Sequence, residues 1–379
     1  MTNDELLSKT IKLLRFPLCA GVPFAHFNLS QGIWIHGEHL GTDNPQWYYI
    51  FIQLASEILP SIIVPCFFLF SGYLFFYHKD FNSGVYKQAI KKRARTLLLP
   101  FLLWNFIAIL WELKCFVPGI SAFFRPMQVE FTPIRFLNTL FCNLPNTGIF
   151  IYPDSTSAAT EVFPIDTPLW YIRELMIMVI LTPIIYWVVK KCKGWGLAVL
   201  GILWGVSNLF KDNPLGLYLG FFFTGAFFFS CGAFFSINKK NFVTEFGKFR
   251  HAIVLYVVLI IIDILTLNMD YNWPIHKVEI LVGVVAVITV AAQLAQWGKV
   301  KIGDTLSGSS FFIYAFHCIF ISDLGKIAFS LLHVPHDNPW AMLALYLAVP
   351  ILSILICLAT YLVLKRYVPM ACKLLTGGR

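Results

Sequence analysis

Long apolar segments occur throughout this chain, and they restrict the fold more than any other feature. An α-helix needs about 17–25 predominantly apolar residues to cross the hydrocarbon core of a bilayer. The composition has the same character, because 58% of the 379 residues are hydrophobic and only 13% are charged. Ten segments are candidate spans, at roughly 12–33, 48–77, 97–117, 168–189, 195–210, 215–236, 251–268, 277–296, 308–331 and 340–364. The sequence therefore predicts an all-α integral membrane protein with about ten transmembrane helices.

The basic residues alternate between successive loops, which indicates the topology. If the N-terminus is cytosolic, 22 of the 29 Lys and Arg residues fall in cytosolic segments and four fall in outside loops. Cytosolic loops are enriched in Lys and Arg, so this alternation predicts that both termini are cytosolic. The same placement explains the net charge of +9 without nucleic-acid binding.

The first segment lacks a signal-peptide cleavage site, so we expect it to remain as a membrane helix. We expect a multi-pass protein of a cell membrane, with the bacterial cytoplasmic membrane favoured. The nine cysteines are scattered and form no CxxC pair, so neither a metal site nor a disulfide framework is predicted. We expect a single membrane domain over residues 1–379, with a long extracytoplasmic loop at about 118–167. Loops of this length are usually functional or disordered.

Arg15 and His26 lie in the first apolar segment, eleven residues apart. In a helix this spacing places them about 16 Å apart along the axis and on nearly one face. An ionisable residue in a span indicates a functional site by default, and a neutral imidazole suits a general base. A core histidine bonded to a freed carbonyl is the alternative for His26, and an anchor that snorkels to the membrane surface is the alternative for Arg15.

A second group of basic residues, Lys92, Arg93 and Arg95, crowds the cytosolic start of the third span. Guanidinium groups bind phosphate bidentately, so this group predicts a cradle for a phosphate-rich cofactor. Topology or the binding of anionic lipid explains the same charges equally well. Ser71 and Gly72 end the second span, where small residues also allow close packing of helices.

Other polar residues within or beside spans are further candidates. Glu57 is either a buried carboxylate or an interfacial one. Arg173 and Glu174 are adjacent at the outer end of the fourth span, so each needs a separate partner. One of them is expected to orient His26 or to hold an acceptor, unless both belong to structural ion pairs. For His317 in the ninth span, functional and structural interpretations stay open.

Together these elements resemble the integral-membrane acyltransferase-3 family, and the resemblance covers essentially the whole chain. The family is similar in the spacing of arginine, ten residues and histidine in its first span, here Arg15 and His26. It is also similar in an FFLFSGYLF-type segment, here 67–75, and in an aromatic segment ending in histidine, here 311–317.

Two family motifs are matched less closely. The basic RxxR form before the third span is present with Lys92 in place of the first arginine and with Arg95 as the second. The tryptophan-led acidic motif is matched by Trp170 and Glu174, with altered spacing. The resemblance implies transfer of an acyl group, usually acetyl, from cytosolic acyl-CoA to a hydroxyl of an extracytoplasmic carbohydrate.

We therefore predict an O-acetyltransferase that uses acetyl-CoA as donor and a carbohydrate or lipid-linked sugar as acceptor, within membrane lipid. The assigned residues are catalytic His26, Glu174 and His317; cofactor-binding Arg15, Lys92, Arg93, Arg95 and Ser71; and substrate-binding Glu57, Trp170 and Arg173. The acceptor is expected between the 118–167 loop and the segment 34–47. Transport of a sugar or lipid, a non-catalytic scaffold, and succinyl transfer remain alternatives.

Overall fold

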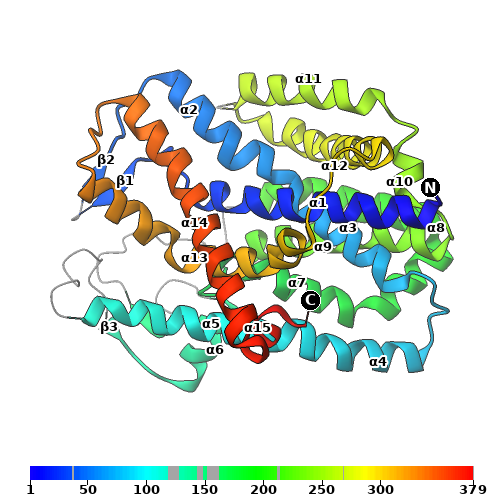
Figure 1. Cartoon of the computed structure of the whole chain (residues 1–379). Helices are drawn as coiled ribbons and strands as arrows, with labels where there is room; N and C mark the ends of the chain where they lie inside the picture. The colour runs from blue at the N-terminus through cyan, green and yellow to red at the C-terminus, as the bar shows by residue number, and fades with distance from the viewer. Residues whose placement is uncertain are drawn as a thin grey trace. The chain divides into compact units, whose positions relative to one another are not determined.

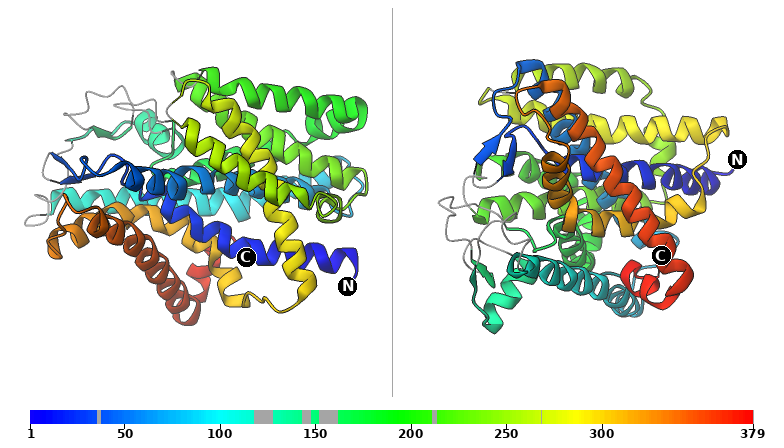
Figure 2. Two further views of the ribbon diagram at one scale, coloured as in Figure 1. Left: turned by 90° about the horizontal axis from the view of Figure 1, so that it is seen from above. Right: turned by 60° about the vertical axis from the view of Figure 1, so that its left-hand side comes forward.

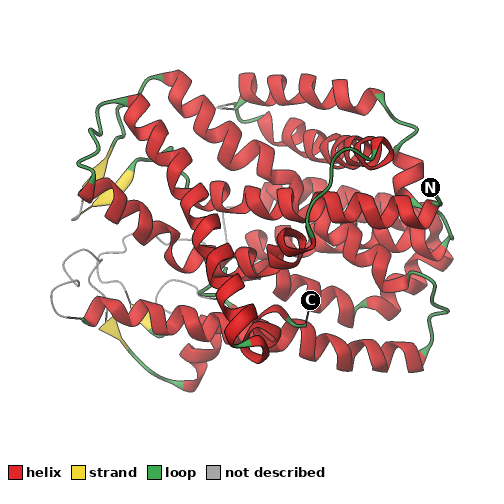
Figure 3. Ribbon diagram, viewed as in Figure 1, coloured by secondary structure: helices red, strands yellow, loops and turns green. Residues whose placement is uncertain are grey.

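Helices provide nearly all the regular structure of the computed structural model, which describes residues 1–35, 38–117, 128–142, 148–151, 162–210, 214–267 and 269–378. Figures 1 and 3 show these helices and short β-strands, which form two two-stranded sheets in the described part of the chain. The α-helices are α1 (Asn3–His26), α2 (Gln46–Gln53), α3 (Ile63–Phe76), α4 (Ser83–Arg93), α5 (Leu99–Glu112), α6 (Pro133–Phe141), α7 (Trp170–Ile180), α8 (Thr182–Val206), α9 (Pro214–Ile237), α10 (Phe242–Phe246), α11 (His251–Thr266), α12 (Asn272–Trp297), α13 (Asp304–Leu331), α14 (Pro339–Tyr367) and α15 (Pro369–Thr376).

Short strand pairs and several irregular helical turns lie between these helices. Strand β1 (Ile33–Ile35) pairs antiparallel with β2 (Glu38–Leu40), and β3 (Gln128–Val129) pairs antiparallel with β4 (Phe150–Ile151). The π-helical turns are Leu54–Ile58 and Ala94–Leu98, and the 3₁₀ turns are Leu59–Ile62, Leu113–Phe116, Thr167–Leu169 and Ser207–Phe210. Much of the long loop predicted at 118–167 lies outside the described residues, namely 118–127, 143–147 and 152–161.

Six helical segments are long and apolar enough to cross a membrane within the described part of the chain. They are Gln46–Phe76, Ser83–Phe116, Leu215–Ile237, Asn272–Trp297, Asp304–Leu331 and Pro339–Tyr367. A seventh is counted if Thr167–Ile180 and Thr182–Phe210, bent by 63° at their junction, form one span. The chain is thus a multi-pass, all-helical membrane protein. The count of ten spans and the cytosolic termini stay predictions.

The first predicted span has different limits in the structure. Helix α1 begins at Asn3 and ends at His26, so the part of the predicted span 12–33 that follows His26 was wrong. The chain leaves the helix because the Asn28 side chain accepts a hydrogen bond from the Ser30 backbone N–H at 2.8 Å, and β1 follows. Such local side-chain bonds compete with helical ones. As a result, His26 occupies a helix end.

The chain folds into two compact units, each assembled from separate parts of the sequence. The first unit contains Met1–Cys19, Ile58–Ala94 and Glu174–Ser310. In it, α3 packs closely on α9, and α11 packs along α12, as Figure 2 shows for the latter pair. The second unit contains Ala20–Glu57, Arg95–Arg173 and Phe311–Arg379.

The second unit has an aromatic-rich core that fixes the end of α1. Its buried side chains include Phe27 and Leu29 just after α1, Tyr48 on α2, Ile321 on α13 and Tyr346 on α14. The Tyr346 hydroxyl also lies 2.8 Å from Ser56 Oγ. This core holds the residue after His26 in place, and therefore holds His26 itself.

Candidate functional site

His26 and His317 come together in the second unit, although 291 residues separate them in the sequence. Their ring centroids are 5.4 Å apart and their planes are inclined by 53°. His317, on α13, is fully buried. Both histidines were predicted as catalytic from sequence, and the structure places them side by side.

A backbone hydrogen bond selects the tautomer of His317. Its Nδ1 lies 2.9 Å from the Ile313 carbonyl oxygen, one turn earlier on α13. A carbonyl oxygen only accepts, so Nδ1 carries the proton and Nε2 presents a lone pair in the neutral ring. Nε2 is buried and has no hydrogen-bond partner among the described residues. The pair thus contains a fixed proton acceptor, which is the arrangement that acid–base chemistry needs.

A pocket of about 430 Å³ opens beside this pair within the second unit. Its lining comes from the turn after α1, from the β1–β2 hairpin and from α13: His26, Phe27, Asn28, Leu29, Gln31, Gly32, Ile33, Trp34, His39, Ser322 and Lys326. The volume falls within the range of small-molecule sites. Aromatic, amide, hydroxyl and ammonium groups all line the pocket, so it can bind a polar ligand through stacking and hydrogen bonds.

Glu57 reaches this pocket through Asn28. The Asn28 amide donates to Glu57 Oε1 at 2.9 Å, and its carbonyl oxygen accepts from Ser30 N at 2.8 Å. Both ends of the Asn28 side chain are therefore fixed. Glu57 itself lies on the π-helical turn Leu54–Ile58. Turns of this kind occur often at functional sites because they re-aim a side chain.

Charged residues on α13 continue the site beyond the histidines. Lys326 Nζ lies 5.2 Å from the centroid of the Trp34 ring, a cation–π contact in the pocket wall. Asp323, three residues earlier, accepts from Trp111 Nε1 at 2.7 Å and pairs with Lys114 at 3.0 Å. Asp323 and Lys326 were assigned no role from the sequence. Their spacing of three residues, which places two side chains on one face of a helix, was the sequence feature that could have indicated a shared site.

Arg173 and Trp170 lie near the long loop. The buried Arg173 guanidinium donates to the Phe141 and Val162 carbonyl oxygens at 2.5 and 2.8 Å. These bonds tie α7 to the ends of two described stretches of the loop. Trp170, the first residue of α7, is half-buried. Their assignment to substrate binding stays a prediction.

Asp166 lies at the end of the long loop and was assigned no role from the sequence. It is almost completely buried, and neither carboxylate oxygen has a hydrogen-bond partner among the described residues. Burial raises its pKa well above the usual value because the charged form loses its hydration. The backbone N–H of Asp166 donates to Asn105 Oδ1 at 3.1 Å, which fixes the residue in place.

The predicted donor-binding residues belong mostly to the first unit. Arg15 is exposed on α1, Lys92 and Arg93 form the last turn of α4, and Ser71 lies on α3. Glu174 is fully buried on α7 in the same unit. Arg95 lies in the second unit, on the π-helical turn Ala94–Leu98.

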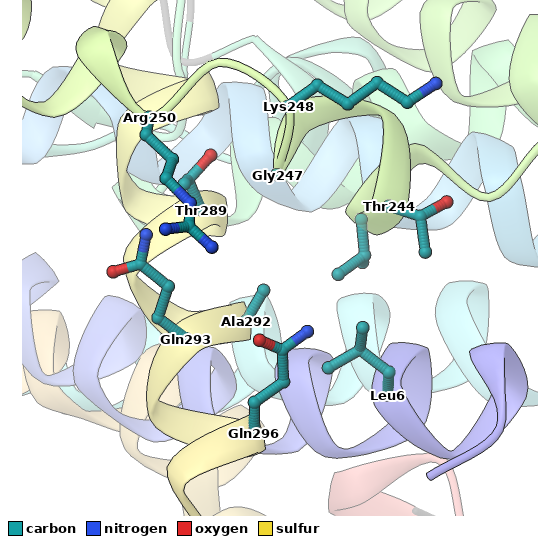
Figure 4. A pocket seen from close by; sticks show the side chains of 10 residues that line it. Leu6, Thr244, Gly247, Lys248, Arg250, Thr289, Ala292, Gln293 and Gln296 are labelled. Atoms are coloured by element: carbon teal, nitrogen blue, oxygen red, sulfur yellow. The ribbon is translucent and has the colours of Figure 1, made fainter.

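Two further pockets in the first unit are lined by none of the assigned residues. One, of about 210 Å³, lies between α10 and α12 and is lined partly by Arg250, Thr289 and Gln293. Figure 4 shows the Arg250 guanidinium next to Gln293, with Lys248 extending away. The other, of about 480 Å³, contains Lys79, Lys190 and Lys239 together with several aromatic rings.

Comparison with known proteins agrees with the motifs. The acyltransferase domain model of the acyltransferase-3 family matches residues 9–362. The chain is also 24% identical over 389 aligned residues to the succinoglycan biosynthesis protein ExoH of Rhizobium meliloti (strain 1021), covering 99% of this chain and 94% of that protein. No solved structure matches the chain. Because the family model spans nearly the whole sequence, this protein belongs to the acyltransferase-3 family and is a multi-pass membrane acyltransferase.

Proposed function

We propose that this protein transfers an acetyl group from cytosolic acetyl-CoA to a hydroxyl of an extracytoplasmic or lipid-linked carbohydrate. The single observation that carries the proposal is the pairing of His26 with His317 at the wall of a polar pocket. The relative ExoH is named for the biosynthesis of a polysaccharide, which supports a carbohydrate acceptor. Succinyl remains the alternative acyl group.

The donor is proposed to be bound through its phosphates, as the sequence predicted. Arg15 is exposed on α1 and is assigned to a phosphate of CoA. Lys92, Arg93, Arg95 and Ser71 are the further donor-binding candidates, because guanidinium groups bind phosphate bidentately.

The acceptor is proposed to occupy the 430 Å³ pocket. Trp34 offers a face for stacking against a sugar ring, and Asn28, Ser322 and Lys326 offer hydrogen-bonding groups. Glu57 is assigned to hold Asn28 in position. The sequence analysis expected the acceptor between the 118–167 loop and the segment 34–47; the pocket includes Trp34 and His39 of that segment but no residue of the loop.

In the proposed reaction, His26 removes the proton from the acceptor hydroxyl as its oxygen attacks the thioester carbon. The carbon–sulfur bond then breaks, and the proton passes from His26 to the departing thiolate. His317 is assigned a positioning role, since its Nε2 lone pair can accept an N–H from His26 and so leave the other nitrogen of His26 free as the base. Transfer through an acetylated His26 is the alternative route.

His26→Ala tests this proposal. A positioned base contributes about 10²–10⁴-fold, so turnover of labelled acetyl-CoA by purified enzyme should fall by that factor. His317→Ala should lower kcat with little change in donor affinity. The matched control is His251→Ala, because His251 is an exposed histidine at the start of α11. Full activity of His26→Ala would refute the mechanism, and absence of any acyl transfer by wild-type enzyme with every acceptor tried would favour transport.

The two chemical routes are separated by incubation with labelled acetyl-CoA in the absence of acceptor. Direct transfer leaves the peptide that contains His26 unlabelled. If that peptide carries label, and the label passes to an acceptor added later, the reaction proceeds through acetyl-histidine and not by direct transfer.

A further inference from the structure

A second polar cluster is buried in the first unit, apart from every residue assigned above. Asp263 on α11 and Glu279 on α12 are both completely buried, and His276 on α12 lies between them. The His276 Nδ1 atom is 2.8 Å from Asp263 Oδ2 and 3.7 Å from Glu279 Oε2. One ligand atom from each of the three residues lies within 4.8 Å of the others.

Surrounding groups satisfy only part of this cluster. The Asn272 amide donates to Asp263 Oδ1 at 2.6 Å, and Ser61 Oγ donates to Glu279 Oε2 at 3.4 Å. Glu279 Oε1 is buried without a hydrogen-bond partner among the described residues, and so is the hydroxyl of Tyr256 on α11, which lies close enough to Glu279 to interact with it. A buried carboxylate oxygen without a partner is costly, so an additional cationic group would stabilise this arrangement.

The charges lead to the same conclusion. If both carboxylates are ionised they carry −2, and a single imidazolium offsets only half of that. Within an apolar helix pair such as α11 and α12, uncompensated charge is strongly disfavoured. One divalent cation with a neutral His276 makes the group electrically neutral. Asp, Glu and His side chains are also ordinary ligands of zinc.

The distances fit a metal ion with small adjustments. Tetrahedral ligands at 2.0–2.1 Å from zinc lie about 3.3–3.4 Å from one another. The two observed separations, 2.8 and 3.7 Å, lie on either side of this value. The Asp263 and Glu279 carboxylate oxygens lie within 4.8 Å of each other, so they would have to approach by up to about 1.4 Å to share one ion, with Asn272 placed to hold the other oxygen of Asp263.

We propose that Asp263, His276 and Glu279 form a binding site for a divalent transition-metal ion, zinc being the best fit, which clamps α11 to α12. The sequence analysis predicted no metal site, because Asp263 and His276 lie 13 residues apart on two different helices and match no metal-binding motif. His276 is about 30% exposed and gives the ion its route to the site. This proposal is independent of the acyl-transfer mechanism.

Metal analysis of the purified full-length protein tests the site. Protein dialysed against zinc and then desalted should retain about one zinc per chain, whereas His276→Gln and Glu279→Gln should retain almost none. The matched control is His78→Gln, since His78 forms an exposed pair with Asp4 at 3.5 Å in the same unit. Equal zinc in wild type and His276→Gln would overturn the proposal, as would retention of no zinc by wild type.

Cobalt substitution gives a second readout that does not depend on the folding of a variant. Wild-type protein stripped with chelator and loaded with Co²⁺ should show intense visible absorption typical of tetrahedral coordination, and zinc should displace it. Thermal unfolding should also shift upward on addition of zinc to the stripped wild type. Weak, octahedral-type absorption together with an unchanged unfolding midpoint would show that the three residues form a hydrogen-bonded group only.

Discussion

Gly72→Ala tests whether the FSGYLF-type segment serves helix packing or ligand binding. An ideal Cβ at Gly72 would lie 2.0 Å from the Phe229 carbonyl oxygen, and one at Gly232 would lie 2.0 Å from the Leu69 carbonyl oxygen. Ordinary contacts begin near 3.4 Å. Both obstacles are backbone atoms, so α3 and α9 would have to separate by more than an ångström. Gly72 on α3 therefore lies against the backbone of α9, and Gly232 on α9 lies against the backbone of α3, where the two helices cross closely.

The cost follows from this geometry. Overpacking of a filled interior usually costs about 1–3 kcal/mol, and we expect about 3 kcal/mol because no side chain can rotate away. This corresponds to a fall in the apparent unfolding midpoint of roughly 5 °C or more. The assay is thermal unfolding of the purified protein in detergent. Donor binding and turnover are measured in parallel at a temperature where both proteins are folded.

Gly205→Ala is the matched control, because a Cβ at that position on α8 meets no atom within 4 Å. It should leave the midpoint unchanged or raise it, since alanine favours a helix over glycine by about 1 kcal/mol. If Gly72→Ala unfolds at the wild-type temperature but has lost turnover, the packing argument is wrong and the glycine is needed beside a ligand.

Two further predictions concern the second unit. Asn28→Ala and Glu57→Gln should each raise the acceptor KM several-fold, measured by steady-state kinetics, with little effect on donor affinity. The double variant should be no worse than Asn28→Ala, because Glu57 acts through Asn28. Additive effects of the two substitutions would contradict this. The buried Asp166 has a raised pKa, so its contribution to stability is complete below its ordinary value of 3.8 and is lost as the pH rises toward the folded-state value. The midpoint of thermal unfolding should therefore decline from pH 4 to 8 as the free energy of unfolding falls by up to about 1.4 kcal/mol per pH unit. Asp166→Asn should flatten this decline. An equally steep decline in the variant would exclude Asp166 as its source.

Composition and spacing alone determined the class of this protein. Apolar runs of about 17–25 residues are long enough to cross a bilayer as helices. Their number therefore predicted the multi-pass helical fold from the sequence alone. The Arg15 and His26 spacing and the FSGYLF-type segment were local patterns, and they indicated the family that the comparisons then confirmed. The ends of the helices were harder to predict. Helix α1 ends at His26, where the Asn28 side chain forms a local hydrogen bond that a hydropathy pattern does not reveal.

Only the tertiary structure brought distant residues together. His26 and His317 form a pair because the second unit packs the end of α1 against α13, and nothing local in either segment encodes the 5.4 Å between their rings. The same is true of Asp263 and His276, which face each other across two packed helices. A helix fixes which residues share its own face, whereas packing between helices decides which faces meet, and that packing depends on side chains throughout the unit.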